Sequence, residues 1–523
     1  MNVPVFLLIA ILLALFLFVG CSINGRPMRV AQGGTANLTA AGDSFYISGQ
    51  PGRAPNISCS FVEFDERGDF LDFEQHIDCQ KRIKALATSN RIVLVMYCHG
   101  WKNNSQSGDV TEFVSFLTKL AASDQFTEEG VQVHGVFLGW RGNAFRPFVD
   151  KGNQNDSYQE TLAAFGEPIV SAKYHRHFCW TYVIPETLSY WNRKRAAEHR
   201  VSGLPMARAI FTYASAAKDY GNKLQNRVLI MGHSFGALML EKSLGQGMIG
   251  EIAMEWWHRE QIQKVPGPKS TEQVLLEKAE IEKPGLPFDL VLFVNSAAPS
   301  IYAKEMRDFL KAHRSALGRA HSAEQDVPVI VSLTSTADWA TGIVHPIGNM
   351  FARFAPSLKR LYTTGIFGNP SHAGAPYPTH KGIRQSDFYI RTPGHQPYLI
   401  NHWIMKEGTK ELSAGSKSAF SANLSPNTPN PDVFFTSNDT SLGTAWKITR
   451  VPPNKSLTLD GMPLSMPDSD YWIISCDKEL IRGHNDVWSK TTMEMYAGIF
   501  RAVESRRGHL RPNPATASPD SRT

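Results

Sequence analysis

The stretch Gly232-His233-Ser234-Phe235-Gly236 decides the fold, because it separates two segments of different character. The residues before it, Arg227-Val-Leu-Ile-Met231, are mostly apolar β-formers and predict a strand. The residues after it, Ala237-Leu-Met-Leu-Glu-Lys-Ser-Leu244, have apolar side chains at helical spacing and predict a helix. Gly232 and Gly236 let a strand and a helix approach closely on either side of a tight turn. A serine at such a turn exposes its hydroxyl, which makes Ser234 a candidate nucleophile.

Apolar runs of strand length recur along the chain, with helical patterns between them. The runs are Ile92–Tyr97, Val131–Leu138, Val228–Met231, Leu290–Val294, Val329–Leu333 and Tyr471–Ser475. Most are almost continuously apolar, as strands buried on both faces of a parallel sheet are. The alternation predicts an α/β fold with a mostly parallel central sheet and helices on both faces.

The remaining segments predict a single large domain over residues 60–503, opened by a β-hairpin around Arg67-Gly68. Residues 22–59 are polar and turn-rich, which is typical of a tether and irregular structure. Two spacers, at about 141–226 and 341–470, are too long for simple crossovers and are candidates for cap or lid insertions. Residues 504–523 are polar and proline-rich, which predicts a disordered tail.

The N-terminus predicts export and attachment to a membrane. Val3 to Gly20 is an uninterrupted apolar run that ends at Cys21. The ending Phe18-Val-Gly-Cys21 resembles a bacterial lipobox, which implies cleavage and lipidation at Cys21, although Phe18 stands where leucine is usual. An uncleaved signal anchor is the alternative, because the run is close to the shortest length that spans a bilayer. Under either alternative the folded part of the chain is exported or membrane-tethered.

Composition indicates a globular protein and excludes some classes of partner. Apolar residues make up 42% of the chain, and a net charge of +6 over 523 residues is modest. Without a dense Lys/Arg run, nucleic-acid binding has no support. The cysteine spacings match no metal pattern, so no zinc site is expected. Cys59 and Cys79 either pair in an oxidising compartment or remain thiols.

Two downstream residues are candidates to activate Ser234 as acid and base. Asp338 lies a few residues past the strand-like run that ends at Leu333, and its alternative role is a helix N-cap. His484 lies beyond the last strand-like run and ahead of the final helix, Trp488 to Val503. His395 and His402, in the second insertion, are the rival bases. Along the chain these residues stand in the order Ser234, Asp338, His484.

Cys98-His99-Gly100-Trp101 follows the first strong strand and is a candidate for the loop that binds an oxyanion. An ordinary turn at the end of a strand is the alternative. With the pentapeptide, Asp338 and His484, the His-Gly pair resembles the α/β-hydrolase superfamily, of the serine esterase or lipase kind, over roughly Ser60 to Val503. The resemblance implies that the backbone N–H groups of Trp101 and Phe235 bind the oxyanion, with His99, Gly100, Gly232 and Gly236 supporting the two motifs.

The resemblance further implies that an ester or other acyl substrate is transferred to Ser234 and hydrolysed by water, with no metal or organic cofactor. Two alternatives remain beside an esterase. One keeps the same triad but cleaves an amide, peptide or thioester, because a fold does not fix the substrate. The other is a noncatalytic, membrane-tethered binding protein of the same fold. The residues do not favour any particular oligomeric state.

Overall fold

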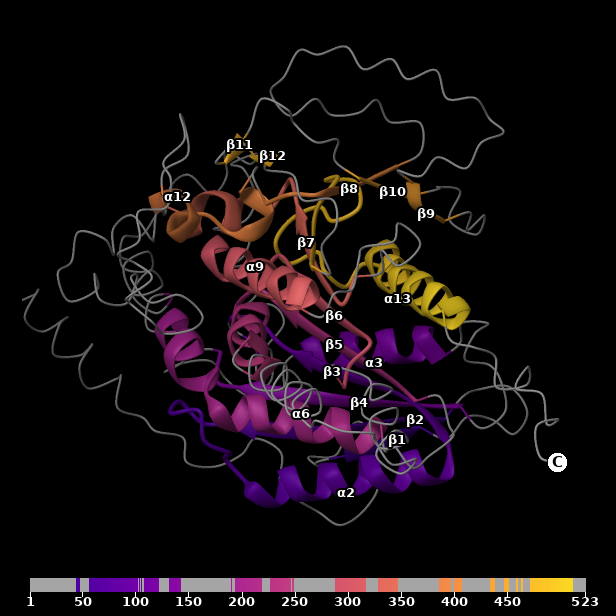
Figure 1. The fold of residues 1–523 in the computed structure, drawn as a ribbon. Coiled ribbons are helices and arrows are strands. Elements are labelled where there is room, and N and C mark those ends of the chain that lie inside the picture. Colours follow the sequence, from indigo (N-terminus) through magenta and orange to yellow (C-terminus); the bar gives the residue numbers. More distant parts are fainter. Residues whose placement is uncertain are drawn as a thin grey trace, which may run out of the picture. The chain divides into compact units, whose positions relative to one another are not determined.

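The architecture comes from a computed structural model of the 523-residue chain (Figure 1). The structure describes residues 44–47, 56–101, 103, 105, 108–121, 131–142, 190, 193–218, 226–245, 247–248, 287–316, 328–346, 385–396, 399–406, 433–437, 446–450, 458–459, 462–463 and 471–510. The lipobox-like segment ending at Cys21 lies outside these residues. No helix among the described residues is long and apolar enough to cross a membrane.

The chain divides into two compact units, whereas the sequence predicted one domain over 60–503. The first unit comprises Met1–Ala122, Phe126–Asn226 and Leu238–Ser243. The second comprises Ser123–Gln125, Arg227–Ala237 and Leu244–Thr523. Each unit contains its own set of hydrogen-bonded parallel strands.

Within the described residues, the first unit has strands hydrogen-bonded in the order β1-β2-β4-β3. Strands β2 (Asn56–Phe64), β4 (Val131–Trp140) and β3 (Arg91–Cys98) are parallel, while β1 (Ser44–Ile47) runs antiparallel to β2. The prediction of irregular structure over residues 22–59 is therefore wrong for β1 and for the start of β2. Ile57, Cys59 and Phe61 alternate along β2 and are buried, a pattern hidden among polar neighbours in the sequence.

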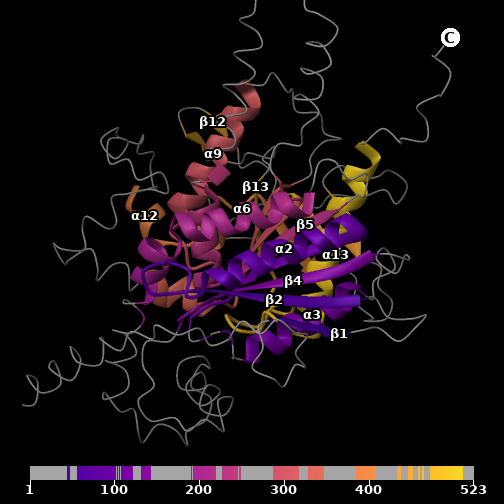
Figure 2. The same cartoon turned by 90° about the horizontal axis from the view of Figure 1, so that it is seen from below.

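Side-chain alternation in these strands brings helices to both faces of the sheet, as Figure 2 shows for α2 and α3. On one face, a Cβ added to Gly135 would meet Leu117 and Phe113 of α3 (Gly108–Ala121), so α3 packs directly on the backbone of β4. On the other face, His134 lies near Ser58 and Ser60, beside α2 (Phe73–Ser89). Helix α6 (Leu204–Lys218) packs against α2 and β3.

The hairpin predicted around Arg67-Gly68 is reduced to a turn. β2 ends at Phe64, Gly68 adopts the left-handed φ of 92°, and a single bridge joins Phe64 to Phe70. The side chain of Asp72 then accepts a hydrogen bond from the Glu74 N–H and caps α2. Because this N-cap begins a helix at residue 73, no second strand can form.

Among the described residues, the second unit has strands hydrogen-bonded in the order β5-β6-β7-β13-β8-β10-β9. The first five are parallel: β5 (Arg227–His233), β6 (Leu290–Val294), β7 (Ile330–Ser335), β13 (Tyr471–Cys476) and β8 (His402–Lys406). β10 (Trp446–Arg450) pairs antiparallel with β8, and β9 (Val433–Ser437) pairs antiparallel with β10. Part of the insertion expected to form a cap thus extends the sheet instead. Two short strands, β11 (Thr458–Leu459) and β12 (Met462–Pro463), pair with each other.

Helices accompany these strands in the described part of the second unit. Helix α9 (Ser300–Ala316) contacts β13 and α12 (Gln385–Ile390), and α13 (Lys490–Leu510) contacts β9. Because α13 continues to Leu510, the tail predicted to be disordered from residue 504 is helical over 504–510. Shorter helical turns lie at Ala197–Val201 in the first unit, and at Ala340–Val344 and Pro393–His395 in the second. The architecture is α/β with mostly parallel strands.

Cys59 and Cys79 are both buried thiols, so the disulfide left open by the sequence is not formed. Burial raises the pKa of the Cys79 thiol to about 12, although hydrogen bonds with Tyr213 and Ser60 act in the opposite direction. A thiol with such a pKa stays protonated at neutral pH and is a poor nucleophile.

The first unit contains a buried histidine that should make stability depend on pH. His134 is hydrogen-bonded through Nδ1 to the Ser58 hydroxyl at 2.7 Å and through Nε2 to the Ser60 hydroxyl at 3.3 Å. Burial lowers the pKa of His134 from 6.5 to about 3. As pH falls, His134 is therefore protonated near pH 6.5 in the unfolded chain but only near pH 3 in the native state. We expect His134 to remove about 1.4 kcal/mol of stability per pH unit as pH falls through this window.

The variant His134→Gln retains polar atoms but does not titrate. Urea unfolding of the variant between pH 7 and pH 4 should show a shallower loss of stability than the wild-type chain, by about that slope. Parallel curves for the two proteins would contradict the protonation state inferred for His134.

Candidate active site

Ser234 lies on a strained turn at the end of β5. Its φ angle is 55°, a left-handed conformation that non-glycine residues rarely adopt. Its N–H donates to the Val294 carbonyl at 3.1 Å, and its carbonyl accepts from the Ala297 N–H at 3.2 Å. Residues 235–245 are helical, so the strand, turn and helix predicted around the pentapeptide are confirmed. Gly232 lies in β5 and Gly236 in the first turn of the helix.

His484 connects Ser234 to Asp338 through hydrogen bonds. It lies between β13 and α13, and its Nε2 is 2.8 Å from Ser234 Oγ. Its Nδ1 is 3.0 Å from Oδ1 and 2.9 Å from Oδ2 of Asp338. An ionised carboxylate only accepts, so Nδ1 carries a proton and Nε2 is left to accept from the serine hydroxyl. The structure thus brings together the three residues selected from the sequence.

Asp338 lies past the end of β7 and is buried. Its two oxygens also accept from the N–H and the hydroxyl of Thr341, so the N-cap-like role considered as an alternative coexists with the contact to His484. Burial tends to raise the pKa of this carboxyl group, but His484, Thr341 and His395 favour the charged form. The net effect lowers the pKa of Asp338, which keeps the group ionised at neutral pH.

The rival histidines occupy other positions. His395 is hydrogen-bonded to Thr392 at 3.0 Å, and its Nε2 would lie 2.8 Å from a Cβ added to Gly342. Burial lowers the pKa of His395, which keeps it neutral near the acid. His402 stacks on Trp472 in the sheet, with ring centroids 3.9 Å apart. His484, rather than either rival, lies within hydrogen-bonding distance of Ser234.

The loop proposed to bind the oxyanion is built around His99 in the first unit. The His99 ring donates through Nδ1 to the Gly100 carbonyl at 2.9 Å, and its Nε2 accepts from the Trp140 N–H at 3.1 Å. Burial lowers the pKa of His99 to about 4, so the ring is neutral. His99 therefore fixes the backbone after β3. Trp101, which follows Gly100, packs its ring against Tyr190. The donor roles of Trp101 and Phe235 stay predictions.

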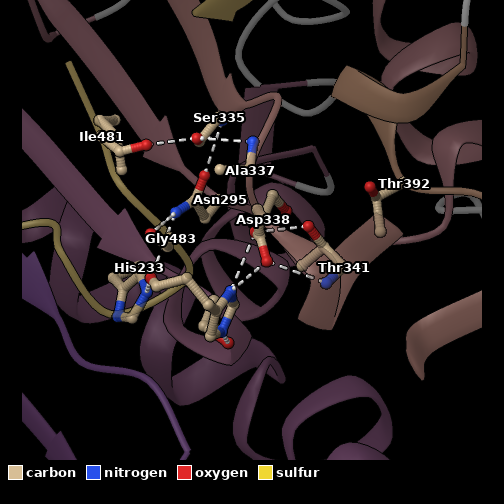
Figure 3. Close-up of polar contacts among 12 residues, drawn as sticks. His233, Asn295, Ser335, Ala337, Asp338, Thr341, Thr392, Ile481 and Gly483 are labelled. Atoms are coloured by element: carbon tan, nitrogen blue, oxygen red, sulfur yellow. Dashed lines mark hydrogen bonds and ion pairs between the residues drawn. The ribbon is translucent and has the colours of Figure 1, made fainter. Parts of the chain in front are cut away.

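Sequence reasoning missed several polar residues around this site. Asn295, Ser335 and Thr341 each contact the segment of Asp338 or of His484 (Figure 3). Asn295 and Ser335 stand at the carboxyl ends of two neighbouring parallel strands, β6 and β7, which is the one signal that could have pointed to them. Among the described residues, no cluster of histidine, cysteine and acidic side chains is arranged to hold a metal ion.

Comparison with known proteins does not assign a family. No protein-family model matches the chain, and no curated protein matches it either. One solved structure, an uncharacterized protein from Pseudomonas aeruginosa, is similar at 10% sequence identity and a TM-score of 0.17. That match covers 53% of this chain and 42% of the other, so the chain spans less than half of the length of that protein.

The strained turn predicts an unusual order of stability for two substitutions of Ser234. Alanine keeps the Cβ that makes φ of 55° unfavourable, whereas glycine adopts this conformation freely. We expect Ser234→Gly to be more stable than Ser234→Ala by about 1 kcal/mol in urea unfolding.

Ser332 in β7 provides the matched control because it is a serine in regular strand structure. There the order should reverse, with alanine more stable than glycine by about 0.5–1 kcal/mol. The same order at both positions would contradict the left-handed turn at Ser234.

Proposed function

We propose that the chain is a serine hydrolase that cleaves a carboxylic ester through an acyl-enzyme on Ser234. The observation that carries the proposal is the hydrogen-bonded series from Ser234 Oγ through His484 to the buried Asp338. A serine hydroxyl is a weak nucleophile, and a neutral imidazole held by a carboxylate is the base that it needs. The strained turn, which exposes the hydroxyl between strand and helix, supports the same proposal.

In the proposed reaction, Ser234 Oγ forms a bond to the carbonyl carbon of the ester as its proton passes to His484 Nε2. The tetrahedral intermediate then expels the alcohol oxygen, which takes that proton from His484. Water, deprotonated by His484, attacks the acyl-enzyme and releases a carboxylic acid and free Ser234. Throughout this cycle Asp338 orients His484 and stabilises its cationic form without taking up the proton.

The proposal includes the α/β-hydrolase fold and a site that binds the oxyanion. We assign the oxyanion donors to the backbone N–H groups of Phe235 and Trp101, by resemblance to that superfamily. Phe235 directly follows the nucleophile and begins the helix over 235–245. Trp101 follows the turn that His99 stabilises in the first unit.

The first test removes the nucleophile. Ser234→Ala should lower hydrolysis of a short-chain p-nitrophenyl ester by at least about 10³-fold, and it should abolish labelling by a fluorophosphonate. Ser89→Ala is the matched control, because Ser89 is exposed at the end of α2 and its hydroxyl bonds to carbonyls of its own helix and to the side chain of the neighbouring Asn90. This control should keep wild-type rates.

Equal ester hydrolysis by wild type and Ser234→Ala would exclude Ser234 as the nucleophile. A folded wild-type chain that does not react with the fluorophosphonate would favour the noncatalytic binding protein. A panel of matched ester, thioester and amide substrates distinguishes the acyl classes, and the ester should be cleaved fastest.

We also propose that this hydrolase is exported and tethered to a membrane by a lipid on Cys21. The apolar run from Val3 to Gly20 and the small residue before Cys21 support the proposal. In a bacterial host, the full chain should fractionate with membranes, and Cys21→Ser should remain unprocessed and keep its apolar N-terminal segment. A wild-type chain of the unprocessed mass would contradict lipidation and favour the signal anchor.

A further inference from the structure

Side chains from three neighbouring strand ends bind the backbone of the segment that carries His484. We call residues 477–489, between β13 and α13, the His484 loop. His233 ends β5, Asn295 directly follows β6, and Ser335 ends β7. Ser335 bonds to the Ile481 carbonyl and Asn295 to the Gly483 carbonyl (Figure 3). His233 bonds to the carbonyl of His484.

Asn295 is the centre of this arrangement because it donates and accepts at the same time. Its Oδ1 accepts from the Ser335 N–H at 3.0 Å. Its Nδ2 donates to the Gly483 carbonyl at 3.3 Å and to the His484 carbonyl at 3.1 Å. The residue is fully buried and has a left-handed φ of 46°, which asparagine tolerates better than most residues. An amide side chain offers both functions at once.

The carbonyl of His484 receives a second hydrogen bond from His233. The distance from His233 Nε2 to this oxygen is 2.8 Å, and the centroids of the two histidine rings are 5.0 Å apart. A carbonyl oxygen has two lone pairs, so His233 and Asn295 together saturate it. Because a carbonyl cannot donate, His233 must carry its proton on Nε2.

We propose that His233 and Asn295 are positioning residues that hold the His484 backbone where its ring can reach Ser234. The inference rests on the proposed function, and it adds residues to which neither the resemblance nor the triad assigns a role. Their hydrogen bonds are to the carbonyl oxygen of His484, the same residue that carries the imidazole. Small displacements of a catalytic group reduce rates strongly, by up to about 10²-fold for 1 Å.

The His484 loop has other hydrogen bonds that should keep it folded when His233 or Asn295 is replaced. The Arg482 N–H donates to the Asp486 side chain at 3.0 Å, and Thr492 Oγ1 donates to the Leu480 carbonyl at 3.1 Å. The Ser335 hydroxyl donates to the Ile481 carbonyl. Removal of one donor should therefore displace His484 without unfolding the second unit.

The test compares His233→Leu with His233→Gln. Leucine fills a similar volume but cannot donate, whereas glutamine can place an N–H close to the position of His233 Nε2. We expect His233→Leu to lower kcat for a p-nitrophenyl ester, and the rate of fluorophosphonate labelling, by about 10- to 100-fold with little change in KM. His233→Gln should restore most of both rates. Equal rates in wild type and His233→Leu would overturn the role of His233.

Asn295→Asp is the second variant, since it exchanges the amide for a carboxylate and retains Oδ1 for the Ser335 N–H. It should slow labelling to a similar extent, because the new oxygen faces two carbonyls. Lys478→Ala is the control in the same loop: this side chain is exposed, so the wild-type rate should be kept. A wild-type rate in Asn295→Asp, or equally slow labelling in Lys478→Ala, would overturn the role of Asn295.

A proton resonance provides a readout that does not need turnover. The Nδ1 proton shared with Asp338 should give a low-field NMR signal that disappears in His484→Gln, and this signal should shift or broaden in His233→Leu and Asn295→Asp. If the wild-type chain fails to react with the fluorophosphonate, the proposed function fails, while this signal still tests the positioning role of His233 and Asn295. An unchanged signal in both variants would overturn that role.

Discussion

The hydrogen bond from His484 Nδ1 to the Asp338 carboxylate is the contact on which the rest of the site depends. Burying a carboxylate costs free energy unless donors surround it, and Asp338 obtains those donors from His484 and Thr341. In return, the ionised carboxylate fixes the tautomer that leaves His484 Nε2 facing Ser234. Each partner therefore defines the chemical state of the other.

Parallel strands supply the geometry for that contact. β5, β6, β7 and β13 are hydrogen-bonded in sequence, so their carboxyl ends lie at one edge of the sheet. Ser234, Asn295 and Asp338 follow the first three of these strands, and His484 follows the fourth. Residues separated by as many as 250 positions in sequence thus meet over a short distance. Rigid strands hold such groups more accurately than long loops do.

The contiguous features of the sequence predicted much of this arrangement. Apolar runs located six strands, and the order of Ser234, Asp338 and His484 after those runs selected residues that lie together. Asn295 was missed because its function depends on carbonyls 188 and 189 positions away, and a backbone carbonyl has no signature in sequence. Strands β8 to β10 were missed because their segment is interrupted by polar, proline-rich residues. The second strand of the hairpin was predicted wrongly because Asp72 caps a helix there.

The choice of donors on the His484 carbonyl has an electrostatic consequence. When His484 takes the proton of Ser234 it becomes a cation, and a positive charge about 5 Å away would oppose it by about 3 kcal/mol at an effective dielectric constant of about 20. Asn295 contacts the His484 carbonyl, and an amide donates without carrying charge. The ring of His233, whose centroid is 5.0 Å from that of His484, donates without charge in its neutral form. The His484 loop can therefore be fixed from both sides while the negative charge of Asp338 continues to act on the imidazole. A lysine or arginine in either position would supply the hydrogen bond but would oppose the proton transfer that the geometry favours.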